Sequence, residues 1–124
     1  MEKDKVSETL LWLDDFRNPY QGSWLYSFAP EYLEQWPVVW VKSYEEFITW
    51  INENGLPRMV GFDHDLGIDE DGTILKSGYD AAKWLVNYCL DNNLGMCHWV
   101  VQSDNPAGRD NINGLLMSYV KHFE

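Results

Sequence analysis

The chain has 124 residues, 45% of them hydrophobic and 15% aromatic, and its formal net charge is −11. This length and apolar content predict one folded domain over residues 1–124, and they exclude an intrinsically disordered chain. The negative charge argues against binding to long nucleic acid, because contacts from Lys and Arg to phosphates supply most of that affinity. A small anionic ligand stays compatible, provided that a metal ion or backbone amides offset the charge.

The N-terminus is charged and lacks the apolar core of a signal peptide, and no apolar run has the length of a membrane span. The two cysteines, Cys89 and Cys97, fit a helix and the start of a strand better than a disulfide framework. A reducing cytoplasm is therefore the predicted location.

The first predicted strand is the apolar run at residues 10–13, which ends at the acidic pair Asp14-Asp15. Arg17 and Asn18 follow closely enough to reach the rim of a site there. The irregular segment beyond them is aromatic, and Pro30 suits the first position of a helix within it. The aromatic side chains either wall a pocket or cover a sheet face that lacks a full helix; they are Phe16, Tyr20, Trp24, Tyr26, Phe28, Tyr32 and Trp36.

A second strand is predicted at residues 38–41, and a helix follows it. Ser43 and Glu46 form a capping-box pattern at the helix start, and Asn54-Gly55 is typical of its end. One apolar stripe at helical spacing lies between them, formed by Tyr44, Phe47, Ile48 and Ile51.

A third strand at residues 59–62 ends at Asp63-His64-Asp65. The stretch "IDEDGTI" predicts a hairpin or loop around Asp71-Gly72. The twelve residues 67–78 have Gly at the first and twelfth positions, where an EF-hand has carboxylates, so calcium binding of that type is not predicted. Ser77 then caps a helix whose predicted buried face is formed by Tyr79, Ala82, Leu85, Val86 and Cys89.

A fourth strand is predicted at residues 99–101, and Asn105-Pro106 opens a final helix. That helix carries an apolar face of Ile112, Leu115, Leu116 and Tyr119. Continuous apolar strands alternating with amphipathic helices predict an α/β three-layer sandwich with a short, mainly parallel sheet of about four strands. In such sheets ligands bind outside the carboxyl ends of the strands, where this sequence places polar residues after three of its four strands.

Four carboxylates at this edge are candidate metal ligands: Asp14, Asp15, Asp63 and Asp65. Gathered together, they would repel one another unless a hard cation such as Mg²⁺ or Mn²⁺ lay among them. Asp63 or Asp65 is also a candidate general base. The alternative interpretation is that these residues are ordinary turn caps. His64 should point away from its two neighbours and is better explained as a structural residue than as a ligand.

The stretch "SDNPAGRDN" is the second candidate site, because it leads from a strand end into a helix N-terminus, where free amides and the helix dipole attract anions. Ser103 can donate to a phosphate oxygen, and Arg109 can clamp one with two hydrogen bonds. The predicted phosphate-binding residues are Ser103, Asn105, Gly108, Arg109 and Asn111. A well-capped helix with a solvated Arg109 is the alternative.

Together these motifs resemble two related groups of proteins. The acidic pair, Asp63 and Ser103 are similar to the response-regulator receiver domain, in which the Asp after the third strand is phosphorylated beside Mg²⁺. After the fourth strand the pattern predicts one more helix, so we do not expect a fifth strand that would supply the receiver's Lys. The closer resemblance is to the cyclic-phosphate processing receiver-like family, on the motifs "LWLDD.RNP", "FDHDLG", "SGYDAAKWL" and "QSDNPAGRDNI". Where that family is expected to have His, this sequence has Gln102.

The resemblance implies a receiver-like fold without the last strand and a metal-dependent phosphoesterase. Its substrate would be a cyclic phosphate on a nucleotide or RNA end, in RNA repair or nucleotide-based defence. In this interpretation Asp63, Asp65, Ser103 and Arg109 are the catalytic residues. The alternative is a non-catalytic module that binds a phosphorylated small molecule or a protein partner. A third hypothesis is phosphotransfer signalling through an aspartyl-phosphate on Asp63.

Overall fold

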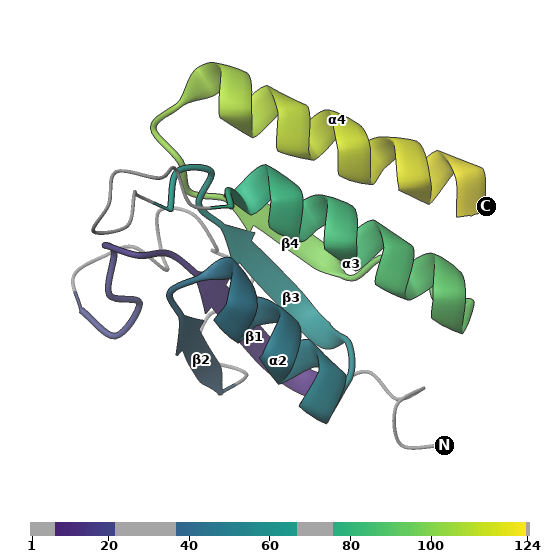
Figure 1. Ribbon diagram of the computed structural model, residues 1–124, viewed down its shortest axis with the longest axis horizontal. Helices are drawn as coiled ribbons and strands as arrows, with labels where there is room; N and C mark the ends of the chain where they lie inside the picture. Colours follow the sequence, from purple (N-terminus) through teal and green to yellow (C-terminus); the bar gives the residue numbers. More distant parts are fainter. Residues whose placement is uncertain (1–6, 22–36, 67–75, 124) are drawn as a thin grey trace.

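The protein is built on a four-stranded parallel sheet with strand order β2-β1-β3-β4 (Figure 1). The computed structural model describes residues 7–21, 37–66 and 76–123. The strands are β1 (Ser7–Leu13), β2 (Val38–Val41), β3 (Pro57–Phe62) and β4 (His98–Val101), and the helices are α2 (Tyr44–Asn54), α3 (Gly78–Asn92) and α4 (Pro106–Phe123). This arrangement confirms the predicted α/β receiver-like class and the parallel sheet.

The three helices lie side by side on one face of the sheet (Figure 1). The connections through α2 and α3 cross the sheet in the same direction, so right-handed crossovers put both helices on the same face. Alternate strand residues point towards them, and the core joins Leu11 and Phe62 of the sheet to Phe47, Leu85 and other buried helix residues. Burial of each such side chain stabilises the fold by roughly 1.5–3 kcal/mol.

The opposite sheet face carries a second apolar cluster. Leu10, Trp12 and Met59 are fully buried there, and Val38 and Trp40 pack against them. The predicted helix at Pro30 and most of the aromatic segment belong to residues 22–36, which lie outside the described residues. The predicted loop "IDEDGTI" around Asp71-Gly72 lies outside them as well.

Two helix starts follow the capping residues that the sequence predicts. The Ser43 side chain accepts a hydrogen bond from the Glu46 amide at 3.1 Å. Ser77 forms a full capping box, because it accepts from the Asp80 amide while the Asp80 carboxylate accepts from the Ser77 amide at 2.8 Å. Gly55, with φ of 90°, ends α2 as predicted.

Cys89 in α3 and Cys97 before β4 are buried free thiols, in agreement with the prediction of no disulfide between them. Burial raises the pKa of the Cys89 thiol to about 12. Among the helices of residues 37–66 and 76–123, none combines the length and hydropathy that a membrane crossing requires.

Candidate metal and phosphate site

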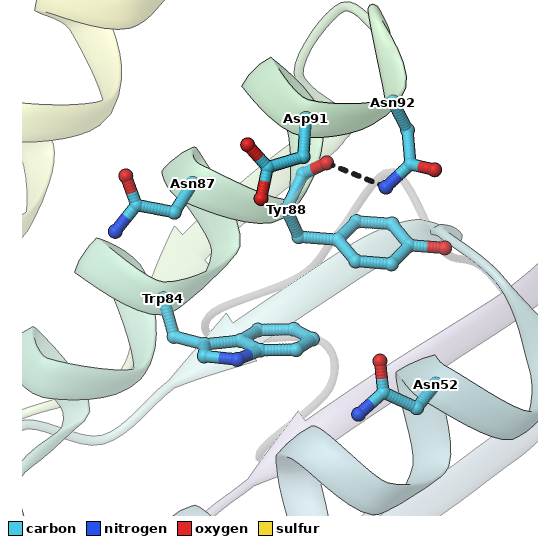
Figure 2. A pocket seen from close by; sticks show the side chains of 6 residues that line it. All are labelled: Asn52, Trp84, Asn87, Tyr88, Asp91 and Asn92. Carbon is cyan, nitrogen blue, oxygen red and sulfur yellow. Dashed lines mark hydrogen bonds between the residues drawn. The ribbon is translucent and has the colours of Figure 1, made fainter.

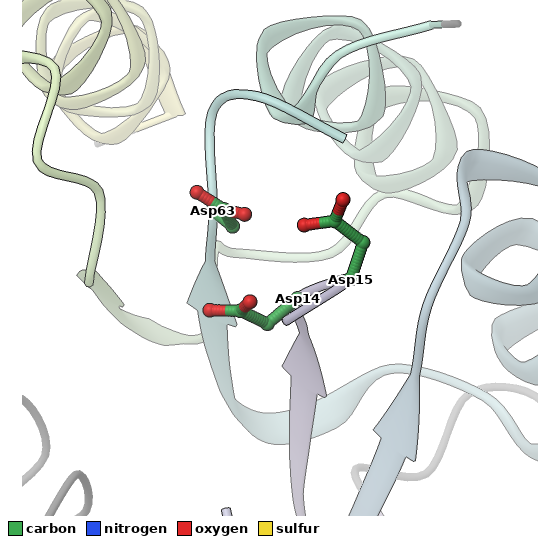
Figure 3. A group of neighbouring side chains, drawn as sticks. All are labelled: Asp14, Asp15 and Asp63. Atoms are coloured by element: carbon green, nitrogen blue, oxygen red, sulfur yellow. The ribbon is translucent and has the colours of Figure 1, made fainter. Parts of the chain in front are cut away.

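Three of the predicted metal ligands meet at the carboxyl edge of the sheet. Asp14 and Asp63 follow the neighbouring strands β1 and β3, and the Asp63 amide donates to the Leu13 carbonyl at 2.9 Å. Carboxylate oxygens of Asp14, Asp15 and Asp63 all lie within 4.8 Å of one another (Figure 3). Asp14 and Asp63 are buried, whereas Asp15 is exposed to solvent.

The loop after β1 wraps around the Asp14 carboxylate. Its Oδ1 accepts hydrogen bonds from the amides of Phe16 at 2.9 Å and Arg17 at 2.7 Å, as in an Asx turn. Two indoles fix the backbone of this loop: Trp40 donates to the Asp14 carbonyl at 2.7 Å, and Trp12 donates to the Arg17 carbonyl at 2.9 Å. The acidic loop is therefore preorganised by buried polar contacts.

Gln102 approaches Asp14 from β4. Its fully buried amide Nε2 donates to the Leu13 carbonyl at 3.0 Å and lies 3.4 Å from Asp14 Oδ2. Gly61 makes room for this arrangement, since a Cβ there would lie 2.7 Å from the Trp12 ring and 3.0 Å from Gln102 Oε1. Gln102 thus positions Asp14, and its amide has no titratable proton with which to serve as an acid or base.

Arg17 lies among these carboxylates, with only 9% of its side chain exposed. Its Nη1 is 3.3 Å from Asp14 Oδ2 and 3.8 Å from Asp63 Oδ1. Its Nη2 donates to Asp104 Oδ2 at 2.8 Å, across 87 residues of sequence. The guanidinium therefore joins the acidic cluster to the loop between β4 and α4.

Asp63 is the carboxyl of this cluster whose pKa the surroundings raise. Burial is the main cause that raises the pKa of its carboxyl from 3.8 to about 8, and the charge of Asp14 raises it further. Arg17 lowers this pKa, and Asp15 raises it through its charge and a hydrogen bond. Without metal, a proton on Asp63 reduces the repulsion among the three carboxylates. A divalent cation bound to them would reduce it in place of that proton.

The residues fit a hard divalent cation. All candidate ligand atoms are carboxylate oxygens, as Mg²⁺ and Mn²⁺ prefer, and the exposed Asp15 leaves one side open for the waters that Mg²⁺ retains. Asp14 already accepts from two amides and contacts two side chains. Asp15 and Asp63 therefore have more free coordination capacity than Asp14.

The structure places Asp65 beside this cluster and not within it. Its exposed carboxylate contacts His64 Nδ1 at 3.0 Å and Asn105 Nδ2 at 3.5 Å. The His64 ring packs on Gly108 of α4, where a Cβ would lie 2.4 Å from the ring. This packing agrees with the predicted structural role of His64, and it puts Asp65 between the β3 end and the predicted phosphate-binding loop, which begins at Ser103.

The start of α3 fixes the position of Asp63. A Cβ on Gly78 would lie 1.8 Å from the Asp63 carbonyl oxygen, and the Gly78 amide donates to the His64 carbonyl at 2.8 Å. Only a residue without a side chain allows this contact. The Gly of the "SGYD" motif is therefore required by the close approach of α3 to the acidic loop.

The predicted phosphate-binding residues lie together at the start of α4, but much of their polar capacity is used within the loop. Ser103, 2% exposed, accepts from the Asn105 amide at 3.0 Å, and Asn105 Oδ1 accepts from the Gly108 amide at 3.0 Å. Arg109 Nη1 donates to the Ser103 carbonyl at 3.3 Å. Asn111 is exposed in the same helix.

A separate hollow of about 400 Å³ lies between α2 and α3 (Figure 2). Trp84 and Tyr88 stack at 5.3 Å between ring centroids and line it, together with side chains that include Asn52 and Asp91. It contains none of the predicted site residues. The carboxyl edge of the sheet therefore remains the candidate functional site.

A parallel α/β sheet with an acidic pair after β1 and a further Asp after β3 defines a receiver-like domain. The family model for the cyclic-phosphate processing receiver domain matches residues 9–118, and the chain belongs to that family. A crystal structure of NtrX from Brucella abortus is similar at 12% identity and a TM-score of 0.46, over 95% of this chain and 28% of that chain. No curated protein matches this chain.

Proposed function

We propose that this domain is a metal-dependent phosphoesterase that opens a cyclic phosphate on a nucleotide or an RNA end. The observation that supports this most is the convergence of Asp14, Asp15 and Asp63 within 4.8 Å at the carboxyl edge of the sheet. Membership of a cyclic-phosphate processing family supports the substrate class. The loop that starts at Ser103 lies close to this cluster, since Arg17 contacts both.

Asp15 and Asp63 hold the cation in this proposal, with Asp14 as a third, more strongly hydrogen-bonded ligand. When bound, Mg²⁺ or Mn²⁺ supplies positive charge for the phosphoryl oxygens and makes water more acidic. Ser103, Asn105, Gly108, Arg109 and Asn111 line the phosphate side. Some of them must exchange an internal hydrogen bond for one to the ligand.

Asp65 is the better candidate for the general base, because it is exposed and lies outside the group of three carboxylates. Its contact with Asn105 places it at the boundary between the metal loop and the phosphate loop. Asp63 would serve this role only if it did not bind the cation. In the covalent variant of the same proposal, the ionised Asp63 carboxylate attacks phosphorus, one P–O bond of the ring breaks, the released oxygen takes a proton from water, and water then hydrolyses the aspartyl-phosphate. The raised pKa of Asp63 opposes this variant, because a protonated carboxyl is a poor nucleophile.

A non-catalytic phosphate-binding module is the second candidate function. Two observations favour it: Gln102 is committed to the Leu13 carbonyl and Asp14, and the Gly108 amide near the start of α4 is capped by the Asn105 side chain. Neither contact supplies a proton for a leaving group. Such a module would bind a phosphorylated small molecule without changing it.

The test is incubation with 2′,3′-cyclic nucleotides and Mg²⁺ or Mn²⁺, followed by separation of products. We expect hydrolysis that Asp63→Asn abolishes and Asp91→Asn retains, because Asp91 is an exposed carboxylate near the far end of α3. Tight binding with an unchanged ligand would establish the module instead. Acid-labile label on Asp63 after treatment with a small phosphodonor would favour phosphotransfer.

A further inference from the structure

Arg17 is the least expected part of the site, because its buried positive charge contacts the same carboxylates that a metal ion would bind. Its Nη1 contacts Asp14 and Asp63, the two buried carboxylates of the cluster. Its own amide and carbonyl are held by Asp14 and Trp12, so the backbone below the side chain is fixed. A change of partners at Arg17 would therefore involve the side chain and not the backbone.

The contact between Arg17 and Asp63 is the weaker of the two. At 3.8 Å it is an ion pair but too long for a hydrogen bond, whereas Asp14 lies at 3.3 Å. A divalent cation bound to Asp15 and Asp63 would repel the guanidinium on this side. Metal binding is thus expected to release Arg17 from Asp63 while Asp14 keeps hold of it.

On its other side, Arg17 already binds an anion. The Asp104 carboxylate accepts from Nη2 at 2.8 Å, although the Asp104 side chain is 92% exposed. Asp104 lies between Ser103 and Asn105 in the proposed phosphate loop. Its carboxylate occupies the position from which a phosphate oxygen would contact the same guanidinium, so a phosphate and Asp104 compete for Nη2.

Arg109 has a different partner, the backbone carbonyl of Ser103 at 3.3 Å, which closes the start of α4. On this basis we infer that Arg17 is the arginine that binds the substrate phosphate. In the free protein Arg17 neutralises Asp14 and Asp63 through Nη1 and binds Asp104 through Nη2. When a divalent cation takes over the neutralisation of Asp63, Nη1 stays on Asp14 and Nη2 exchanges Asp104 for the phosphate. This inference rests on the proposed function, and it extends that function by coupling the cation site to the anion site through one side chain.

The first experiment measures binding of inorganic phosphate to the full chain in saturating Mg²⁺ by ³¹P NMR titration. Arg17→Met should weaken binding at least tenfold, and Arg109→Met should weaken it less. Asp104→Asn should tighten binding severalfold because it removes the competing carboxylate. Asp110→Asn is the matched control: it removes one exposed negative charge from the same region of α4 and should change binding less than twofold.

The second experiment measures the rise in Tm on adding Mg²⁺ without phosphate, and it keeps the inference testable if Arg17→Met is unstable. The variant should be less stable than the native protein without metal and should gain more from Mg²⁺, because the cation replaces the missing charge. An equal rise in Tm in both proteins would show that Arg17 does not share the charge-neutralising role of the cation, and it would overturn the inference.

Unchanged phosphate binding in Arg17→Met, or indistinguishable Asp104→Asn and Asp110→Asn, would also overturn it. If the native protein bound Mg²⁺ but no phosphate, the phosphate role of Arg17 would be refuted, whereas the proposed function is decided separately by the hydrolysis of 2′,3′-cyclic nucleotides. The thermal experiment would still decide whether Arg17 is the counter-ion of the acidic cluster.

Discussion

Magnesium binding should tighten steeply between pH 6 and pH 8, because the cation must displace a proton from Asp63. Burial, then the charge of Asp14, raises the pKa of this carboxyl to about 8, with Arg17 opposing them. For a single group with this pKa, the ionised fraction is about 1% at pH 6 and about 50% at pH 8. The apparent association constant should therefore rise about fifty-fold over these two pH units.

Isothermal titration with MgCl₂ at pH 6, 7, 8 and 9 measures this directly. Repeating each titration in two buffers of different ionisation enthalpy gives the number of protons released per ion. We expect the release of nearly one proton per ion at pH 6 and 7, about half a proton at pH 8, and close to none at pH 9. Asp63→Asn should weaken binding strongly and leave any residual binding without this pH dependence, whereas Asp65→Asn should keep it, because Asp65 lies outside the cluster.

An affinity that stays flat from pH 6 to pH 8, with no proton release, would refute this reasoning. It would mean either that Asp63 is ionised throughout the range or that the cation binds elsewhere. Binding that retains its full pH dependence in Asp63→Asn would point to a different titrating group.

Without metal, thermal stability should fall as pH rises from about 4 to 8, because the folded state binds more protons at Asp63 than the unfolded chain does. Asp63→Asn should flatten this curve of Tm against pH. A Tm that rises over this range would contradict the raised pKa of Asp63. Gly78→Ala should cost about 3 kcal/mol or more in urea unfolding, because its Cβ would lie 1.8 Å from the Asp63 carbonyl. Gly114→Ala is its control, with open space around the new Cβ, and should stabilise α4 by about 0.5–1 kcal/mol; equal effects would contradict the close approach of α3. Gln102→Ala should cost about 1–3 kcal/mol in the same assay, because it removes the buried hydrogen bond from Gln102 to the Leu13 carbonyl and the contact with Asp14, and a neutral result would show that these contacts contribute little.

The sequence predicts the fold well because its patterns are local. Apolar runs bounded by capping residues mark each strand and helix, and Ser43, Ser77 and Gly55 mark helix ends that the structure confirms. Parallel strands then bring Asp14 and Asp63 to one edge, since the strands that precede them are neighbours in the sheet.

What could not be read from the sequence depends on contacts between distant segments. Arg17 is four residues from the end of its strand, and only the fold shows its ion pair with Asp104, 87 residues away. Gly78 and Gly108 look like ordinary helix residues until Asp63 and His64 are found against them. The sequence did contain two signals of these contacts. Arg17 lies close after the acidic pair, and Gly78 and Gly108 each lie just inside the start of a helix.

The central claim is that a divalent cation binds among Asp14, Asp15 and Asp63. An anomalous difference map from crystals grown with Mn²⁺ tests it most directly. We expect one strong peak at the carboxyl edge of the sheet, in contact with Asp15 and Asp63 oxygens and lost in Asp63→Asn crystals. A map without a peak there, or with peaks only at exposed carboxylates such as Asp91, would contradict the account.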